Sequence, residues 1–158
     1  MDTLTILTAK YLIILSPLLA MYALYKAPVE KRREIVIFGA ITLPLAYVLA
    51  LIARHFWYDP RPFVVSGVTP LIPHAADNGF PSDHVLSAAA LAAVVGYFNR
   101  KLAAILWLIA FTIGVARVAA GVHHAIDILG SIVVVLAAKC LARAIMPRLW
   151  NRSIRANS

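Results

Sequence analysis

The sequence predicts an all-α integral membrane protein, with one domain over residues 1–158 built as a bundle of about five transmembrane helices. Of its 158 residues, 62% are hydrophobic and only 14% are charged. The mean hydropathy of +0.83 is too high for an ordinary soluble domain. The apolar residues also gather in long runs between short polar connections, as expected for a chain that crosses a bilayer repeatedly.

Five apolar stretches are expected to be membrane helices. In chain order they run from Leu4 to Tyr25, Ile35 to Ala53, Val85 to Phe98, Leu102 to Ala116 and Ile126 to Ile145. Several are shorter than the roughly 20 residues that cross a hydrocarbon core, so polar residues at their ends must help to reach the interface. The first run has Asp2 where a signal peptide would be basic, so we expect it to remain as a helix.

The longest connection, from Arg54 to Asp83, is rich in proline and glycine and has no strong periodic pattern. A loop of this length is usually functional. It ends in "NGFPSDH", which places Asp83 and His84 directly before an apolar helix. Ser82 suits the N-cap of that helix, and the amides that follow it would form an anion site at the positive helix end.

The net charge of +8 would suggest a nucleic-acid partner in a soluble protein, but topology explains it in a membrane protein. Eleven of the fifteen cations fall on one side of the predicted membrane: Lys26, Lys31, Arg32, Arg33, Arg100, Lys101, Lys139, Arg143, Arg148, Arg152 and Arg155. The other side receives only Lys10, Arg54, Arg61 and Arg117. The positive-inside rule therefore predicts an outer N-terminus and a cytoplasmic C-terminus. Membrane lipids are sufficient partners for the basic tail, and no nucleic acid is needed.

The predicted outer side also holds all five histidines and five of the seven acids: His55, His74, His84, His123, His124, Asp2, Asp59, Asp77, Asp83 and Asp127. Arginine's planar fork suits phosphate, and histidine suits proton transfer or nucleophilic attack. This combination indicates a phosphate-handling site. On composition alone, the alternative is a solvated outer loop with scattered polar side chains.

His123 and Asp127 are four residues apart at the expected start of the last helix. This spacing places the carboxylate and the imidazole on one helix face. A carboxylate that accepts a proton from one ring nitrogen fixes the tautomer and leaves the other nitrogen free to attack. His124 is expected to point elsewhere. Lys10 is expected to extend towards the interface, while His74 could touch a distal phosphate.

Three segments together resemble the signature of the type-2 phosphatidic acid phosphatase superfamily, which reads K-x6-R-P, then P-S-G-H, then S-R-x5-H-x3-D. Here the segments are Arg54-x6-Arg61-Pro62, Pro81-Ser82-Asp83-His84 and Ala116-Arg117-x5-His123-x3-Asp127. Order and spacings match throughout. Within the superfamily, the stretch "LIPHAADNGFPSDH" looks like bacterial undecaprenyl-diphosphatases associated with bacitracin resistance.

The resemblance implies a role for each matched residue. His123 would be the nucleophile that forms a phosphohistidine, Asp127 its orienting partner and His84 the general acid. The phosphoryl oxygens would be held by Arg54, Arg61, Ser82, Arg117 and the backbone near Asp83. No metal or other cofactor is implied, because arginines and amides supply the positive field.

The implied substrate is a phosphorylated isoprenoid or glycerolipid at the outer face of a bacterial inner membrane. Undecaprenyl diphosphate comes first, and the alternatives are phosphatidylglycerophosphate, phosphatidic acid and lipid A. A non-catalytic lipid-phosphate binder or transporter is the alternative of a different class. Such a protein would use the arginines but would have no need for a spaced His–Asp pair and a second histidine.

Three positions depart from the signature. Arg54 replaces a lysine, which keeps the charge but changes reach and fork geometry. Asp83 replaces a glycine and is expected to face away from the phosphate or to repel poorly fitting substrates. Ala116 replaces a serine.

Overall fold

The structure is a computed structural model that describes residues 2–155, with side chains described through residue 147. The side chains of the predicted topology cations Arg148, Arg152 and Arg155 therefore lie outside the described residues. The regular elements of the described part are all helical: α1 (Asp2–Tyr11), the 3₁₀ turn η1 (Leu12–Ile14), α2 (Leu15–Lys26), α3 (Val29–Phe56), α4 (Pro62–Ser66), α5 (Asp83–Val95), α6 (Arg100–Ala119) and α7 (Ala125–Arg155). This confirms the predicted all-α fold.

Within the described residues, four segments are long and apolar enough to cross a membrane: Asp2–Lys26, Val29–Phe56, Arg100–Ala119 and Ala125–Pro147. The fifth predicted stretch forms α5, which is shorter. It ends at Val95 instead of Phe98, because the chain turns at Gly96 and the side chain of Asn99 accepts the amide of Leu102 to start α6. Conversely, α3 begins six residues before the predicted Ile35, because its first turns are charged and an apolar run does not reveal them.

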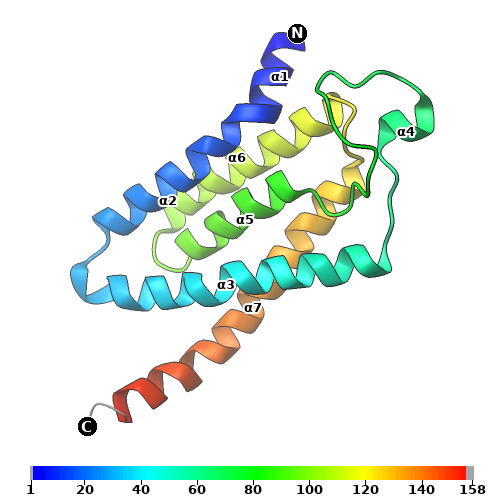
Figure 1. Cartoon of the computed structure of the whole chain (residues 1–158). Helices are drawn as coiled ribbons and strands as arrows, with labels where there is room; N and C mark the ends of the chain where they lie inside the picture. The colour runs from blue at the N-terminus through cyan, green and yellow to red at the C-terminus, as the bar shows by residue number, and fades with distance from the viewer. Residues whose placement is uncertain (1, 156–158) are drawn as a thin grey trace.

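Helix α5 occupies the centre of the bundle and contacts α2, α3, α6 and α7 (Figure 1). Eight of its 13 residues are buried, and most of these are alanine, which lets neighbouring helices approach closely. At 1.5 Å per residue, α5 is about 20 Å long, less than the roughly 30 Å hydrocarbon core. Because protein surrounds it instead of lipid, it need not span the bilayer. We therefore interpret its N-terminus as recessed within one end of the bundle.

That end of the bundle collects several helix termini. Figure 1 shows the start of α1, the end of α3, the start of α5, the end of α6 and the start of α7 together, with the C-terminus of the chain at the opposite end. The α2–α3 and α5–α6 connections also lie at the opposite end. The histidine-rich segments and the cation-rich connections are thus separated along the bundle axis, as the sequence predicts.

The long connection between α3 and α5 folds back over this same end of the bundle, and the side chain of Asn78 holds the returning part of the connection in place. The Asn78 side-chain oxygen accepts the amides of Asp59 and Phe80, both at 3.0 Å. Its side-chain nitrogen donates to the carbonyl of Trp57 at 2.9 Å and to that of Arg54 at 3.2 Å. One asparagine therefore fixes the end of α3 against the segment that leads into α5.

Candidate active site

His123 and Asp127 meet at the start of α7, as their spacing predicts. The His123 Nδ1 atom lies 3.1 Å from Oδ2 of Asp127, and the two side chains are 2% and 0% exposed. On the other edge of the ring, Nε2 lies 3.3 Å from Nη1 of Arg61. A guanidinium can only donate, so Nε2 accepts and Nδ1 carries the proton given to Asp127. This tautomer leaves a lone pair on Nε2, which is what nucleophilic attack requires.

The surroundings of His123 also keep the imidazole neutral. Burial is the main cause that lowers the pKa of His123, and the charges of Arg117 and Arg61 lower it further. The hydrogen bond to Asp127 opposes them, but the net direction is down. Near neutral pH the ring is therefore unprotonated on Nε2.

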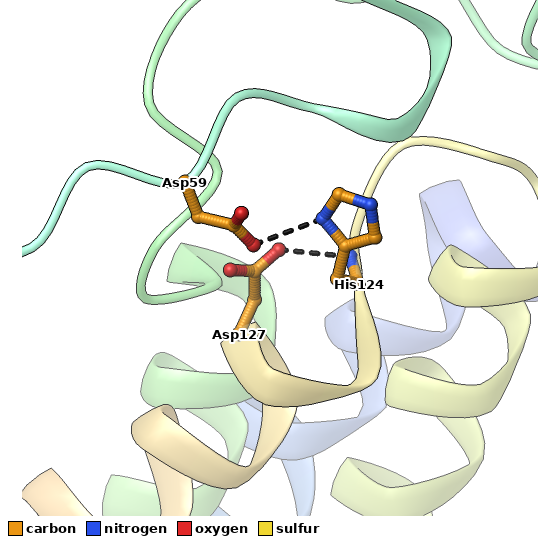
Figure 2. Close-up of side chains that lie close together, drawn as sticks. All are labelled: Asp59, His124 and Asp127. Atoms are coloured by element: carbon orange, nitrogen blue, oxygen red, sulfur yellow. Dashed lines mark hydrogen bonds and ion pairs between the residues drawn. The ribbon is translucent and has the colours of Figure 1, made fainter. Parts of the chain in front are cut away.

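Asp127 has a second partner in the backbone amide of His124, which donates to Oδ2 at 2.9 Å. The His124 ring turns the other way, with Nδ1 2.9 Å from Oδ2 of Asp59 (Figure 2). Asp59 belongs to the α3–α4 connection, so this contact fastens that loop to the residue whose amide holds Asp127. The His124 ring therefore points away from His123, as predicted, while the His124 amide supports Asp127.

Asp59, His124 and Asp127 each offer one potential metal-ligand atom within 4.8 Å of one another. By distance alone, the three could hold a divalent cation. However, the facing atoms of Asp59 and His124 already form a hydrogen bond, and Oδ2 of Asp127 faces two N–H donors. We therefore interpret this cluster as a hydrogen-bonded support for Asp127.

Arg61 is buried directly before α4. Its Nε donates to Oδ1 of Asp77 at 2.7 Å, and its Nη1 donates to the carbonyl of Val122 at 2.8 Å. Burial alone would raise the pKa of Asp77, but the hydrogen bond and charge of Arg61 outweigh it, so the pKa is lowered. Asp77 therefore stays ionised and fixes the guanidinium beside His123.

Arg117 and Ser82 are also buried near this site, and each keeps a free donor. Arg117 donates from Nη1 to the carbonyl of Ala9 at 3.4 Å, but its Nε has no partner among the described residues. Ser82 occupies the N-cap position of α5 as predicted, yet its hydroxyl makes no capping bond and likewise has no partner in the described chain. Buried polar groups are normally paired. An anionic phosphoryl group is the kind of ligand that would satisfy them.

The remaining predicted residues lie at the rim. Arg54 pairs with Asp83 through Nη2 and Oδ1 at 2.7 Å, and the side chains are 34% and 66% exposed. The carboxylate of Asp83 is therefore directed at Arg54. His84 is half-buried and lines a cavity of about 280 Å³ together with Arg117.

Several residues of the site were missed by the motif-based prediction. Ser131 lies on α7, and its hydroxyl lies 2.8 Å from the carbonyl of Asp127 and 3.0 Å from that of Ser82, which links α7 to the start of α5. A Cβ at Gly79 would lie 2.9 Å from Oδ2 of Asp127, so glycine fits there without displacing the carboxylate. Asp77, Asn78 and Gly79 lie just before the Pro81–His84 segment, and this position was the sequence feature that could have pointed to them.

Comparison with known proteins assigns the chain to a family. A sequence model of the PAP2 superfamily matches residues 34–151. The chain belongs to the PAP2 superfamily. Over 136 residues it is 32% identical to undecaprenyl-diphosphatase BcrC of Bacillus subtilis, covering 86% of this chain and 70% of BcrC. This PAP2 protein is thus an integral membrane hydrolase that acts on lipid phosphates.

Two solved structures share the fold of this PAP2 protein. The crystal structure of LpxE from Aquifex aeolicus superimposes with a TM-score of 0.71 at 28% identity, covering 90% of this chain and 85% of that one. A PAP2-type phosphatidylglycerolphosphate phosphatase from Bacillus subtilis gives a TM-score of 0.57 at 20% identity, covering 93% and 84%. The second similarity bears on the fold alone.

Proposed function

We propose that this PAP2 protein removes the terminal phosphate of undecaprenyl diphosphate through a phosphohistidine on His123. The observation that carries the mechanism is the arrangement of His123 between Asp127 and Arg61, which leaves Nε2 unprotonated. The substrate is supported by the similarity to BcrC, which is named an undecaprenyl-diphosphatase, and by the loop stretch "LIPHAADNGFPSDH".

In the first step, Nε2 of His123 attacks the terminal phosphorus, and the bond from phosphorus to the bridging oxygen breaks. His84 gives its proton to that oxygen, and undecaprenyl phosphate leaves. Asp127 stabilises the positive charge that develops on the His123 ring. In the second step, water attacks the phosphohistidine, His84 takes a proton from the water, and inorganic phosphate departs from His123.

Charge on the transferred phosphoryl group is stabilised by the donors around His123. Arg61, Arg117 and Ser82 are buried there, and Arg54 lies at the rim with the backbone near Asp83. Buried donors act in a low-dielectric site, where they stabilise developing charge more strongly than in water. These groups take the role that a metal ion plays in other phosphoryl transfers, so excess chelator is expected to leave the activity intact.

We further propose that the reaction takes place at the outer face of the bacterial cytoplasmic membrane. The site shares one end of the bundle with the N-terminus, while the cation-rich connections lie at the other end. The positive-inside rule puts the cation-rich end in the cytoplasm. The site would therefore meet lipid diphosphates in the outer leaflet.

The direct test is phosphate release by the purified protein, with undecaprenyl diphosphate and phosphatidylglycerophosphate assayed side by side. We expect faster release from the diphosphate. Faster release from phosphatidylglycerophosphate would move the assignment to glycerolipid monophosphates, and phosphate binding without release from either would identify a lipid-phosphate binder.

The nucleophile can be tested in the same preparation. With the terminal phosphate radiolabelled, His123→Ala should give no labelled protein and no turnover, whereas His124→Ala should still be labelled and lose less than about tenfold in rate, because the amide that holds Asp127 remains. Comparable losses in the two variants would show that the wrong histidine has been assigned.

A further inference from the structure

A cavity of about 280 Å³ adjoins the proposed active site on the side of His84. Its lining includes Lys10, Tyr11, Ile72, His74, His84 and Arg117, and no carboxylate of the described residues is among its lining groups. The nearby carboxylates Asp83 and Asp77 are paired with Arg54 and Arg61. The cavity therefore presents nitrogen donors and positive charge to whatever enters it.

Lys10 is held at this cavity by the packing of its neighbour Ala9. Ala9 is fully buried in a cluster with Ile72 and Ala116, and its carbonyl accepts Nη1 of Arg117. Asp2 lies eight residues earlier, so Lys10 lies about 12 Å along the helix from the start of α1. The side chain of Lys10 is exposed, with Nζ 5.6 Å from the centroid of the Tyr11 ring, so its ammonium group lies on the open side of the cavity.

His74 reaches the cavity from the α4–α5 connection. Its Nδ1 atom is buried and has no hydrogen-bond partner among the described residues. Burial, followed by the charges of Arg61 and Arg117, lowers the pKa of His74. A neutral His74 keeps one N–H donor, and its ring centroid lies 6.2 Å from that of His123.

The position of His84 determines which part of a substrate this cavity receives. In the proposed mechanism, His84 protonates the oxygen that leaves, so the atoms bonded to that oxygen lie next to His84, which lines the cavity. In a lipid diphosphate, those atoms are the phosphate that stays on the lipid. In a lipid monophosphate, they are the first carbons of the lipid, which gain nothing from charged donors.

We propose that Lys10, His74 and Arg117 form a subsite for the retained phosphate of a lipid diphosphate, and that this subsite makes the enzyme prefer diphosphates to monophosphates. The inference rests on the proposed function, because it uses the assigned roles of His84 and His123. Arg117 is shared by the two phosphates, whereas Lys10 and His74 contact only the retained one. Lys10 and His74 are therefore the positions at which the preference can be removed without removing the chemistry.

The test compares kcat/KM for undecaprenyl diphosphate and undecaprenyl phosphate, two substrates with the same lipid. Lys10→Met removes the charge but keeps a long side chain, and we expect a loss of about 10- to 100-fold on the diphosphate, the size of one hydrogen bond to a charged group. The monophosphate rate should change less than about twofold. Lys10→Arg should restore most of the diphosphate rate. Lys101→Met, at the opposite end of the bundle, removes the same charge and should alter neither rate.

The monophosphate rate of each variant also reports whether that variant is folded. Should Lys10→Met fail to fold, His74→Phe must show the same selective loss on the diphosphate. Equal losses on both substrates, or an unchanged diphosphate rate, would overturn the subsite and leave the proposed function standing. A wild-type enzyme that cleaves the monophosphate but not the diphosphate would overturn the proposed function itself, and the subsite with it.

Discussion

Arg54 and Asp83 form an ion pair across the rim of the site, with Nη2 of Arg54 2.7 Å from Oδ1 of Asp83. These are two of the three positions at which the sequence departs from the family signature, which has lysine and glycine there. The two unusual residues therefore compensate each other: the added carboxylate neutralises the guanidinium. Because both side chains are partly exposed, the pair contributes little to folding stability. We interpret it as a contact that an arriving phosphate must displace.

Removing Asp83 should therefore tighten phosphate binding. Asp83→Ala frees Arg54, and we expect the inhibition constant of inorganic phosphate to fall by up to about fivefold, the usual range of an exposed pair. Arg54→Ala should raise the constant, and adding Asp83→Ala to it should have little further effect. If Asp83 acts only by general repulsion of anions, its removal will help equally with and without Arg54.

Gly79 is expected to be essential for placing Asp127. In Gly79→Ala, the new Cβ would lie 2.9 Å from Oδ2 of Asp127 and 3.3 Å from the carbonyl of Asp59, so the carboxylate must shift. A displacement of a catalytic group by about 1 Å can lower kcat by about 10²-fold, and we expect a loss of up to this size. Gly39→Ala, whose Cβ would meet only Cγ1 of Val94 at 3.4 Å, is the matched control and should keep wild-type activity. Full activity of Gly79→Ala would mean that Asp127 tolerates displacement.

The burial of His123 predicts the pH below which phosphoenzyme formation slows. Attack requires neutral His123, so the single-turnover rate of phosphoenzyme formation should fall as pH drops through the pKa of His123. Burial lowers this pKa, so the rate should hold to below the ordinary value of about 6.5. A loss of rate on acidification that already begins above that value would contradict the assignment.

Asp127→Asn distinguishes two possible causes of the fall in rate at low pH, which are protonation of His123 and protonation of the substrate's own phosphate. The substitution removes the interaction that raises the pKa of His123, so the fall in rate should move to lower pH while the substrate's ionisation stays in place. The rate itself should fall by about 10³- to 10⁴-fold, because the tautomer is no longer fixed. A fall in rate at an unchanged pH would assign the titration to the substrate.

The sidedness of the site can be tested with a cysteine in the long connection. Gly67 has a φ of 69°, which disfavours any side chain, so the neighbouring Val68, 67% exposed, is the better position. In a Cys140→Ser background, Val68→Cys should react with an impermeant thiol reagent on intact cells, whereas Lys101→Cys should react only after the membrane is opened. The reverse pattern would place the site in the cytoplasm.

The helices and the His123–Asp127 pair could be predicted because both depend on residues that are close together in the sequence. Apolar runs reveal membrane helices through their length, and a four-residue spacing at a helix start places two side chains on one face. The end of α5 could not be found in this way, because Tyr97 and Phe98 are apolar although the chain has already turned at Gly96. The helix ends where Asn99 starts the next one.

The contacts that support the site were not predictable from spacing. His124 and Asp59 are 65 residues apart, and Arg61 and Asp77 are 16 apart within a connection that has no period. Their meeting depends on the path of that connection, which Asn78 holds through three hydrogen bonds to the backbone of the connection and one to the backbone of α3. The sequence grouped these acids with the histidines at one end of the bundle, but only the folded loop shows which base each acid meets.

The role of His84 predicts that the two undecaprenyl substrates depend on this residue to different extents. Cleavage of the diphosphate expels a phosphate monoester whose second pKa is about 6, so the departing oxygen needs little help from an acid. Cleavage of the monophosphate expels an alkoxide, whose conjugate acid has a pKa near that of water, roughly 15.7. General acid catalysis contributes about 10²- to 10⁴-fold, and that contribution should concentrate on the poorer leaving group.

His84→Ala should therefore slow phosphoryl transfer to His123 much more for undecaprenyl phosphate than for undecaprenyl diphosphate. Single-turnover rates are the appropriate measurement, because hydrolysis of the phosphoenzyme can limit the steady state. Lys10→Met is expected to show the reverse selectivity, so each variant serves as the control for the other. Equal losses from His84→Ala on both substrates would mean that His84 mainly positions the phosphate, and its role as the leaving-group acid would have to be withdrawn.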